Sequence, residues 1–309
     1  MMNVILVTSC SNRKTIPLSK RISSENLPYG SLTEVALAWK ALLNTDTIKI
    51  KAQELYCGRG FSEAKKAAQQ LNAEHWIISA GLGLVHVDHE VPGYDITVSG
   101  RGHASVRPKV ADFPFNAQKW WSEINSNNTL TELIESRPNS LIIFAIPTNY
   151  FQMVSAELSS LNAEQLQRIR IIGPAIKSLS KTFKSVHLPY DARLDGPNSP
   201  IRGTRSDFPQ RAAHHFARYI WPESKSGTAI NHINLIISSM EKMAFPFLPD
   251  RVRKTDSEIT QLIIKNWEKS SGYSSRMHRI LRDEELVSCE QKRFQKLFHN
   301  VKQLGEQYR

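Results

Sequence analysis

The stretch NVILVTS at residues 3–9 decides the fold class of this chain of 309 residues. It is apolar and rich in β-branched side chains, and it stops at the polar turn CSNRK, residues 10–14. A short apolar run that ends in a polar turn is typical of a strand buried on both faces of a sheet. Similar runs predict further strands at 75–79, 140–146 and 168–172, with a shorter one near 185–188.

Segments with apolar residues at helical spacing separate these strands. Residues 31–43 begin with Ser31 and Glu34 in the arrangement of a capping box, and residues 62–72 begin with Ser62 as a candidate N-cap. Further helices are expected at 113–124, 129–136, 149–160, 175–184 and 207–220. Continuous apolar strands that alternate with helices indicate an α/β domain with a mostly parallel sheet covered by helices.

The character of the chain changes after the polar stretch WPESKSG at 221–227. No further strand pattern follows, and helical periodicity covers 228–243, 255–268, 274–285 and 288–304. We therefore expect an α/β domain at 1–221 and an all-helical domain at 228–309.

The charge balance favours a polyanionic partner. The chain has 40 Lys+Arg and 29 Asp+Glu, a formal net charge of +11. The excess is spread along the sequence, with +4 in residues 221–309 and the remaining +7 before them. A basic excess of this size is typical of proteins that bind nucleic acid, although it does not establish such a partner.

Other features narrow the class of protein. No apolar run approaches the roughly 18 residues that a membrane-spanning helix needs, and the first residues do not resemble a signal peptide. The three cysteines lie far apart and lack the spacing of a disulfide framework or a zinc site. We expect a cytoplasmic protein that needs no metal or other cofactor and has no membrane partner.

Two long polar loops follow predicted strands, at 80–107 and 187–207. Ligands of open α/β sheets bind outside the carboxyl ends of the strands, so these loops are candidate sites. The first loop carries Asp88 and the pair Tyr94–Asp95, which would place a stacking surface beside a carboxylate. It can also be read as a plain strand-to-loop turn.

The second loop combines carboxylates and arginines. Its residues of this kind include Asp191, Arg193, Arg202 and Arg205. They would suit phosphate binding with acid–base assistance, or a structural network of arginines and aspartates.

The turn after the first strand holds Ser9, Cys10, Arg13 and Lys14. Small hydroxyls and a basic pair at this position could hold a phosphate or the edge of a base. Alternatively, Cys10 is a small buried residue and the basic pair belongs to the solvated surface.

Two other turns could serve the same ligand. Arg59 and Phe61 precede a predicted helix, where an anion would find free backbone N–H groups. Asn149 and Tyr150 follow the strand at 140–146, and could read and stack on a base. The alternatives are a simple Gly-Arg-Gly turn, and helix capping with aromatic core packing.

Basic side chains also occur at regular spacing near the C-terminus. Arg276, Arg279 and Arg282 are three residues apart, and Lys292 and Arg293 begin the next helix. Two short helices joined by a tight turn could dock on DNA. The acidic run 283–285 between them favours instead a solvated charged surface.

Three motifs together resemble a bacterial YaaA-related family. They are CSNRK at 10–14, ELYCGRGF at 54–61 and SAGLGLVHVDHEVPGYDITV at 79–98. That family is related in fold to the uracil-DNA-glycosylase-like superfamily, and the resemblance covers roughly residues 3–216. The tail SSRMHRILRDEELVSCEQKRF at 274–294 resembles the C-terminal extension of phage-defence DNA glycosylases, which remove glucosylated hydroxymethylcytosine.

This resemblance implies a DNA glycosylase that flips a modified base out of double-stranded DNA and hydrolyses its N-glycosidic bond. The Gly-Gln-Asp-Pro-Tyr-His motif of uracil glycosylases is absent, so the carboxylate must come from elsewhere. We expect Asp95 in this role, with Asp88 and Asp191 as reserves. Base contacts are expected from Tyr94, Asn149, Tyr150, Phe61, Arg59, Ser9 and Cys10. DNA contacts are expected from Arg13, Lys14, Arg193, Arg202, Arg205, Arg276, Arg279, Arg282, Lys292 and Arg293.

Two other functions fit the same residues. One is a non-catalytic DNA-binding protein similar to YaaA-related stress proteins, and the other is an enzyme that acts on free nucleotides or nucleosides.

Overall fold

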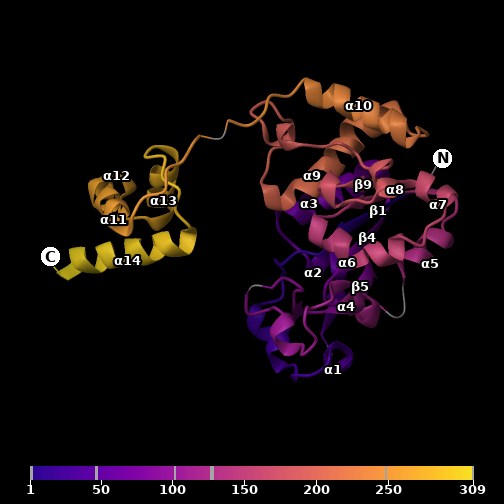
Figure 1. Cartoon of the computed structure of the whole chain (residues 1–309), viewed down its shortest axis with the longest axis horizontal. Helices are drawn as coiled ribbons and strands as arrows, with labels where there is room; N and C mark the ends of the chain where they lie inside the picture. Colours follow the sequence, from indigo (N-terminus) through magenta and orange to yellow (C-terminus); the bar gives the residue numbers. More distant parts are fainter. Residues whose placement is uncertain (1–2, 46–47, 101, 126–128, 248, 308–309) are drawn as a thin grey trace. The chain divides into compact units, whose positions relative to one another are not determined.

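The computed structural model describes residues 3–45, 48–100, 102–125, 129–247 and 249–307 (Figure 1). The chain divides into two compact units, Met1–Pro246 and Phe247–Arg309. Among the described residues, no helix is both long and apolar enough to cross a membrane.

A five-stranded sheet forms the centre of the first unit. Its strands are β1 (Asn3–Ser9), β4 (Glu74–Ser79), β5 (Gly83–His86), β8 (Ser140–Ala145) and β9 (Ile169–Ile172), in the order β5-β4-β1-β8-β9. All neighbours are parallel except β5, which runs antiparallel to β4. The α/β class and the mostly parallel sheet are therefore confirmed.

Two strand expectations need correction. β5 was expected to be part of a loop, but Gly83 has a φ of 74° and turns the chain back onto β4. The segment near 185–188 is no strand, because it makes only a single bridge between Ile171 and His187.

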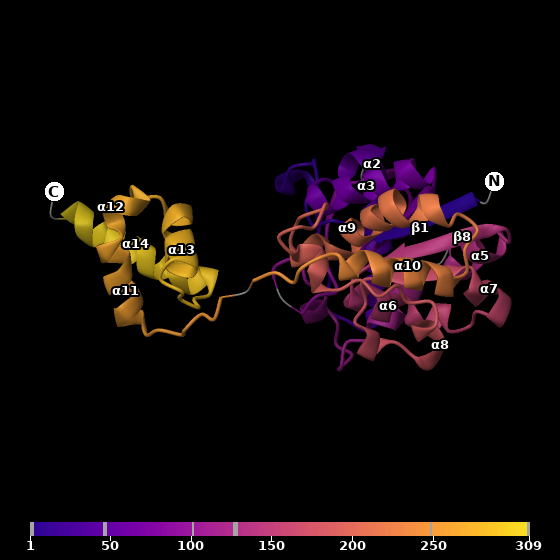
Figure 2. The ribbon, with the colours of Figure 1, turned by 90° about the horizontal axis from the view of Figure 1, so that it is seen from above.

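The alternation of side chains along β1 creates two cores. Ile5 and Val7 pack with α1 (Leu32–Thr45), α4 (Ala117–Ile124), α5 (Leu130–Glu135) and α6 (Thr148–Leu158). Val4 and Leu6 pack with α3 (Arg59–Leu71), α9 (Phe208–His215) and α10 (Ala229–Glu241). Helices thus cover both faces of the sheet, whose strands β1 and β8 lie side by side in Figure 2.

The boundary between the units lies further along the chain than expected. The sequence predicts an α/β domain at 1–221 and a helical domain at 228–309, but α10 belongs to the first unit. Ile236 and Met240 of α10 are fully buried against the sheet, and His232 accepts a 3.0 Å hydrogen bond from the buried Arg170. The polar stretch before α10 is a turn on the surface of the same unit, and the break follows Pro246.

The loop at 80–107 is also more ordered than expected. It contains β5, β6 (Glu90–Pro92) and β7 (Tyr94–Asp95), which pair with β4, β3 (Lys49–Lys51) and β2 (Ile22–Ser23) respectively. The remaining short helices of this unit are α2 (Ala52–Leu55), α7 (Ala163–Gln167) and α8 (Lys181–Lys184). Helix α3 begins at Arg59 after the N-cap Gly58, so the expected cap at Ser62 is wrong.

The second unit is all-helical in its described part, with α11 (Asp256–Lys265), α12 (Trp267–Ser270), α13 (Ser274–Asp283) and α14 (Gln291–Gln307). Ile263, Met277 and Phe294 form its own buried core. This confirms an all-helical C-terminal part, although a shorter one than expected.

Candidate functional site

The sheet has a topological switch point between β1 and β8. From β1 the chain adds β4 and β5 on one side, and it then crosses to add β8 and β9 on the other. Loops leaving β1 and β8 therefore diverge at the carboxyl edge and leave a crevice, which is where ligands of open α/β sheets bind.

A cavity of about 560 Å³ occupies this position. We call it the switch-point cavity. Four segments line it: the turn after β1, the start of α3, the turn after β8 and the start of α9. The lining residues are Ser9, Cys10, Ser11, Asn12, Arg13, Gly58, Arg59, Gly60, Phe61, Pro147, Tyr150, Thr204, Ser206, Asp207 and Gln210.

The structure brings together six of the residues expected to bind base or DNA. These are Ser9, Cys10, Arg13, Arg59, Phe61 and Tyr150. They come from three segments, and α3 and α9 lie side by side on the sheet (Figure 1). Helix α9 also contributes two lining residues that sequence reasoning did not select as site residues, Asp207 at its N-cap and Gln210.

Asp207 is the carboxylate in the wall of the cavity. Its side chain is only 6% exposed, and Oδ1 accepts 2.7 Å hydrogen bonds from Arg211 Nε and from the Thr204 N–H. Arg59 Nε lies 2.8 Å from Oδ2. Burial raises the pKa of Asp207, but these hydrogen bonds and the two guanidinium charges outweigh it, so the pKa lies below its ordinary value. The cavity thus contains an ionised carboxylate.

Gln210 stands one turn further along α9. Its side chain is buried, and Nε2 donates a 3.2 Å hydrogen bond to Ser9 Oγ. Its Oε1 has no hydrogen-bond partner among the described residues. A buried polar atom without a partner is costly, so the free end of this amide is available to a ligand.

The turn after β8 closes the cavity on one side. Tyr150 Oη lies 3.0 Å from Cys10 Sγ, and burial raises the pKa of Tyr150 well above its ordinary value. The tyrosine therefore stays neutral and can donate its proton to an acceptor. Phe61 also belongs to the lining, but stacking on His75 buries most of its ring.

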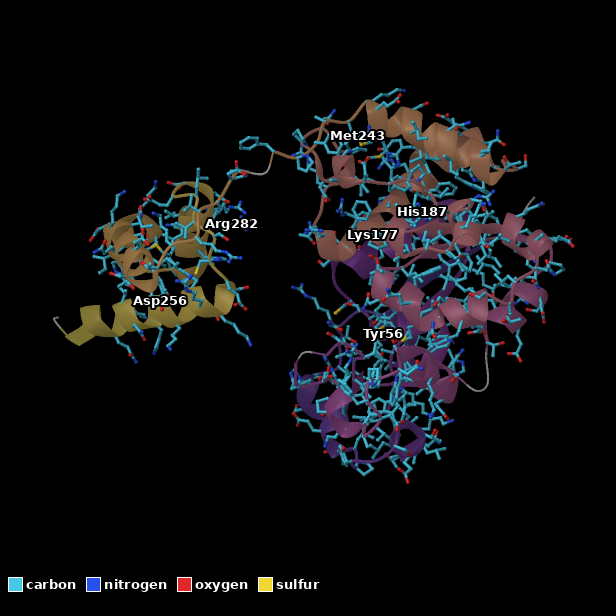
Figure 3. The ribbon with its side chains drawn as sticks, viewed as in Figure 1. Tyr56, Lys177, His187, Met243, Asp256 and Arg282 are labelled. Carbon is cyan, nitrogen blue, oxygen red and sulfur yellow. The ribbon has the colours of Figure 1, made fainter. Side chains whose placement is uncertain are left out.

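A buried polar cluster lies beside the cavity, at the carboxyl end of β4. Tyr94 Oη lies 2.8 Å from Tyr56 Oη and 2.6 Å from Ser79 Oγ (Tyr56 is labelled in Figure 3). The Nζ of Lys14 lies 4.3 Å from the centre of the Tyr94 ring. Tyr94 is 1% exposed and Lys14 is 9% exposed.

Their burial corrects two expectations. Tyr94 is not placed to stack on a base, because its ring is enclosed by its own neighbours. Lys14 is not placed to hold a surface phosphate. Burial lowers the pKa of Lys14, Arg21 adds to this effect, and the nearby Cys10 and Asp95 oppose it.

Asp95 lies behind this cluster and does not line the cavity. Its Oδ2 lies 3.0 Å from His103 Nε2, and its Oδ1 lies 3.9 Å from Arg21 Nη1. The carboxylate is thus paired with Arg21 and His103, and its charge also acts on Lys14. Asp95 is close to the site but reaches it only through other side chains.

The two reserve carboxylates are not in the cavity. Asp88 follows β5, which runs back along β4, so it lies at the amino edge of the sheet. There its exposed carboxylate accepts a 2.7 Å hydrogen bond from Gln53 and lies 3.6 Å from Lys51 Nζ. Asp191 caps a short turn and forms a paired contact with Arg193.

The second loop is organised by a buried arginine. Arg211 is fully buried and donates hydrogen bonds to Asp207, to Asp195 and to the carbonyl oxygens of Leu194, Ile201 and Thr204. This is the structural network that the sequence left as an alternative. Arg193 belongs to the same kind of pairing, whereas Arg202 and Arg205 are exposed. Arg205 lies between the lining residues Thr204 and Ser206, and Arg202 donates a hydrogen bond to the Pro197 carbonyl oxygen.

Asn149 lines a neighbouring cavity of about 660 Å³. The other walls of that cavity come from the loop around Val98–Gly100 and from the start of α4. Asn149 and Tyr150 are consecutive but line different cavities. The expectation that both contact the same base is therefore not met.

The second unit presents basic side chains on α13 and α14. Arg276 and Arg279 are exposed and form no ion pair within the part of the chain that the structure describes. Arg282 is paired with Asp283 through two hydrogen bonds of 2.8 and 3.0 Å (Arg282 is labelled in Figure 3). Arg293 donates a 2.7 Å hydrogen bond to Asp256, and Lys292 is exposed.

The expected tight turn precedes α13 rather than following it. Ser271 and Gly272 have φ values of 53° and 69°, and they reverse the chain between α12 and α13. A longer segment of non-helical residues joins α13 to α14.

Within the described ranges, no group of three or more His, Cys, Asp or Glu side chains is arranged to hold a metal ion.

Comparison with known proteins adds one similarity. Residues 44–172 match a family described as a family of unknown function (DUF6884). The matched segment includes Phe61, Asp95 and Tyr150, but it does not reach Ser9 or α9. No curated protein matches the chain.

Proposed function

We propose that this protein is a DNA glycosylase that removes a modified base at the switch-point cavity. The observation that carries this proposal is Asp207, an ionised carboxylate in the wall of a cavity at the switch point of the sheet. The cavity volume of about 560 Å³ is in the range of small-ligand sites. The motif resemblance supplies the expected substrate, glucosylated hydroxymethylcytosine in phage DNA.

The role of the carboxylate follows from the positive charge that develops on the sugar as the base departs. When the bond between the base and C1′ breaks, the base takes the bonding electrons and the sugar becomes an oxocarbenium-like cation. An ionised carboxylate held in place stabilises this cation. Water then supplies a hydroxyl group to C1′, and its remaining proton goes to the departing base.

We assign the carboxylate role to Asp207 rather than to Asp95. Asp207 lines the cavity, whereas Asp95 faces Lys14, Arg21 and His103 outside it. Asp95 is then a positioning residue that offsets the charge of Lys14 beside the cavity. Tyr150 supplies an aromatic surface in the lining, which also includes Ser9, Cys10 and the edge of the largely buried Phe61.

Double-stranded DNA would also contact the exposed basic side chains. Arg13 lines the cavity and Arg205 lies next to its lining residues, while Arg202 is exposed on the same loop as Arg205. Arg276, Arg279 and Lys292 lie on the second unit. Their contacts are with phosphates, which give affinity without sequence preference.

The test is release of free base. The full chain is incubated with phage DNA that contains glucosylated hydroxymethylcytosine, and the small-molecule fraction is analysed by mass spectrometry. We expect free modified base and an equal number of alkali-labile abasic sites.

The same assay separates the alternatives. If the chain binds DNA and releases no base, it is a non-catalytic binding protein. If base is released from the free modified nucleoside as fast as from DNA, the substrate is a nucleoside.

A further inference from the structure

The start of α3 forms one wall of the switch-point cavity. This helix has 13 residues, and Gly58 precedes it with a φ of 94° and no side-chain cap. The backbone N–H groups of Arg59, Gly60 and Phe61 make no hydrogen bond to another described residue. Free N–H groups in the first turn of a helix carry partial positive charge and favour an anion.

Gln210 provides a second and independent sign of a ligand at this place. Its side chain is 7% exposed, and one end of its amide has no partner. A Cβ atom at Gly60 would lie 3.7 Å from Gln210 Oε1, so the unpartnered end adjoins the first turn of α3.

The amide of Gln210 can present either end to the ligand. Rotating it by half a turn lets the Ser9 hydroxyl donate to Oε1, which turns the NH₂ group toward the cavity. In this orientation the amide donates a hydrogen bond beside the free N–H groups of α3. Both elements then act as donors to one acceptor.

The charges around this point favour an anion. Arg13 and Arg59 line the cavity, and Arg211 lies buried behind Asp207. Arg59 and Arg211 both pair with Asp207, Arg211 also pairs with Asp195, and Arg13 adds a further positive charge to the lining. Arg59 is half-exposed, and its guanidinium pairs only with Asp207 among the residues that the structure describes. It can therefore turn toward an anion with little loss of packing.

We propose that the amino end of α3 is a phosphate-binding subsite of the switch-point cavity. The phosphate accepts hydrogen bonds from the first N–H groups of α3 and from Gln210, and it pairs with Arg13 and Arg59. Because Arg59 turns from Asp207 to the phosphate, binding also leaves the Asp207 charge less neutralised. The proposed function is needed only to name the source, a phosphate of the DNA strand next to the flipped nucleotide.

The test measures thermal unfolding of the full chain with inorganic phosphate, at ionic strength matched with chloride. A ligand that binds only the folded state raises the Tm, and the stabilisation grows with the logarithm of one plus the ratio of ligand concentration to Kd. We expect phosphate and deoxycytidine 5′-monophosphate to raise the Tm, and deoxycytidine to leave it near the chloride value.

Variants locate the site. Arg59→Ala and Gln210→Glu should weaken phosphate binding roughly tenfold, because each removes a charge-assisted or polar contact. Lys65→Ala removes the same charge from the same helix, away from the cavity, and should bind phosphate as the wild type does.

Two results would overturn the proposal. One is an effect of phosphate no greater than that of matched chloride. The other is wild-type phosphate affinity in both Arg59→Ala and Gln210→Glu. Arg59 lies at the surface, so its variant stays interpretable even if the buried substitution impairs folding.

A third experiment, which compares a short oligonucleotide with the monophosphate, identifies the source of the phosphate. A short single-stranded oligonucleotide that binds more tightly than the monophosphate supports a strand phosphate, and equal affinity supports a free nucleotide. Phosphate binding without base release would contradict the glycosylase while supporting the subsite. Base release without phosphate binding would support the glycosylase and contradict the phosphate subsite.

Discussion

The two edges of the central sheet carry similar residue types in different surroundings. At the amino edge, Asp88 is 54% exposed and makes contacts with Lys51, His86 and Gln53 at the surface. At the carboxyl edge, Asp207 is buried between Arg59 and Arg211 in a cavity wall. The presence of a charged residue therefore does not define a site. Water screens the exposed Asp88 carboxylate, whereas arginine contacts fix the buried Asp207 carboxylate in the cavity wall.

The largest expected effect concerns the arginine that organises the carboxyl edge. Arg211→Ala leaves Asp207 and Asp195 without their buried partner, so we expect the free energy of unfolding to fall by roughly 3–5 kcal/mol. Urea unfolding measures this, with exposed Arg205→Ala as the control, expected within about 0.5 kcal/mol of the wild type. A similar value for both variants would mean that the network does not support the loop.

Acidification tests a buried group near the amino edge. Burial lowers the pKa of His75 to about 3, while the unfolded chain titrates near 6.5. The unfolded state therefore binds more protons between these values, and stability falls as the pH drops below about 6.5.

Between pH 6.5 and pH 5, titration of His75 should lower the free energy of unfolding by roughly 1–2 kcal/mol. His75→Gln should reduce this part of the pH dependence, as measured by urea unfolding at each pH. An unchanged slope would show that other groups, such as the buried His215, account for all of it.

Exposed charges on the second unit should affect DNA affinity alone. Replacing Arg276 and Arg279 by Ala removes two phosphate contacts, so the slope of log affinity against log salt should fall by about 2. Titrations of duplex DNA at several salt concentrations measure this. An unchanged slope would indicate that α13 does not contact DNA.

The smallest effect is expected at Tyr150. Tyr150→Phe keeps the ring in the cavity but removes the hydroxyl that meets Cys10 Sγ. Loss of one neutral hydrogen-bond donor should slow base release roughly three- to tenfold. A larger loss would indicate that the tyrosine proton takes part in the departure of the base.

Much of the fold could be predicted because the signals are local. The runs at 3–9, 75–79, 140–146 and 168–172 each form a strand, since continuous apolar sequence suffices for burial on two faces. β5 could not be predicted in this way, because the four residues Gly83–His86 form a strand only through pairing with β4. The unit boundary was wrong because polar residues before α10 say nothing about which core the helix joins.

The site could be predicted only in part. Candidate site residues were chosen in the turns after β1 and β8 and before α3, and six of these candidates line the cavity. Gln210 and Ser9 are 201 residues apart in sequence and meet because α9 packs against α3. The apolar stripe of a helix indicates that it packs, but not on which partner.

Burial explains the residues that were misplaced. Tyr94 and Lys14 lie in the buried polar cluster and Asp95 is paired with Arg21 and His103, but their sequence pattern would be the same if they lined the cavity.

The rates of base release by Asp207→Asn and Asp88→Asn test the central claim most directly. Both variants exchange a carboxylate for an amide of equal size on the same sheet. We expect Asp207→Asn to release base roughly 100-fold or more slowly than the wild type, because it removes a group that stabilises developing charge. Asp88→Asn should release base at the wild-type rate. Wild-type release by Asp207→Asn would contradict the assignment of catalysis to the switch-point cavity.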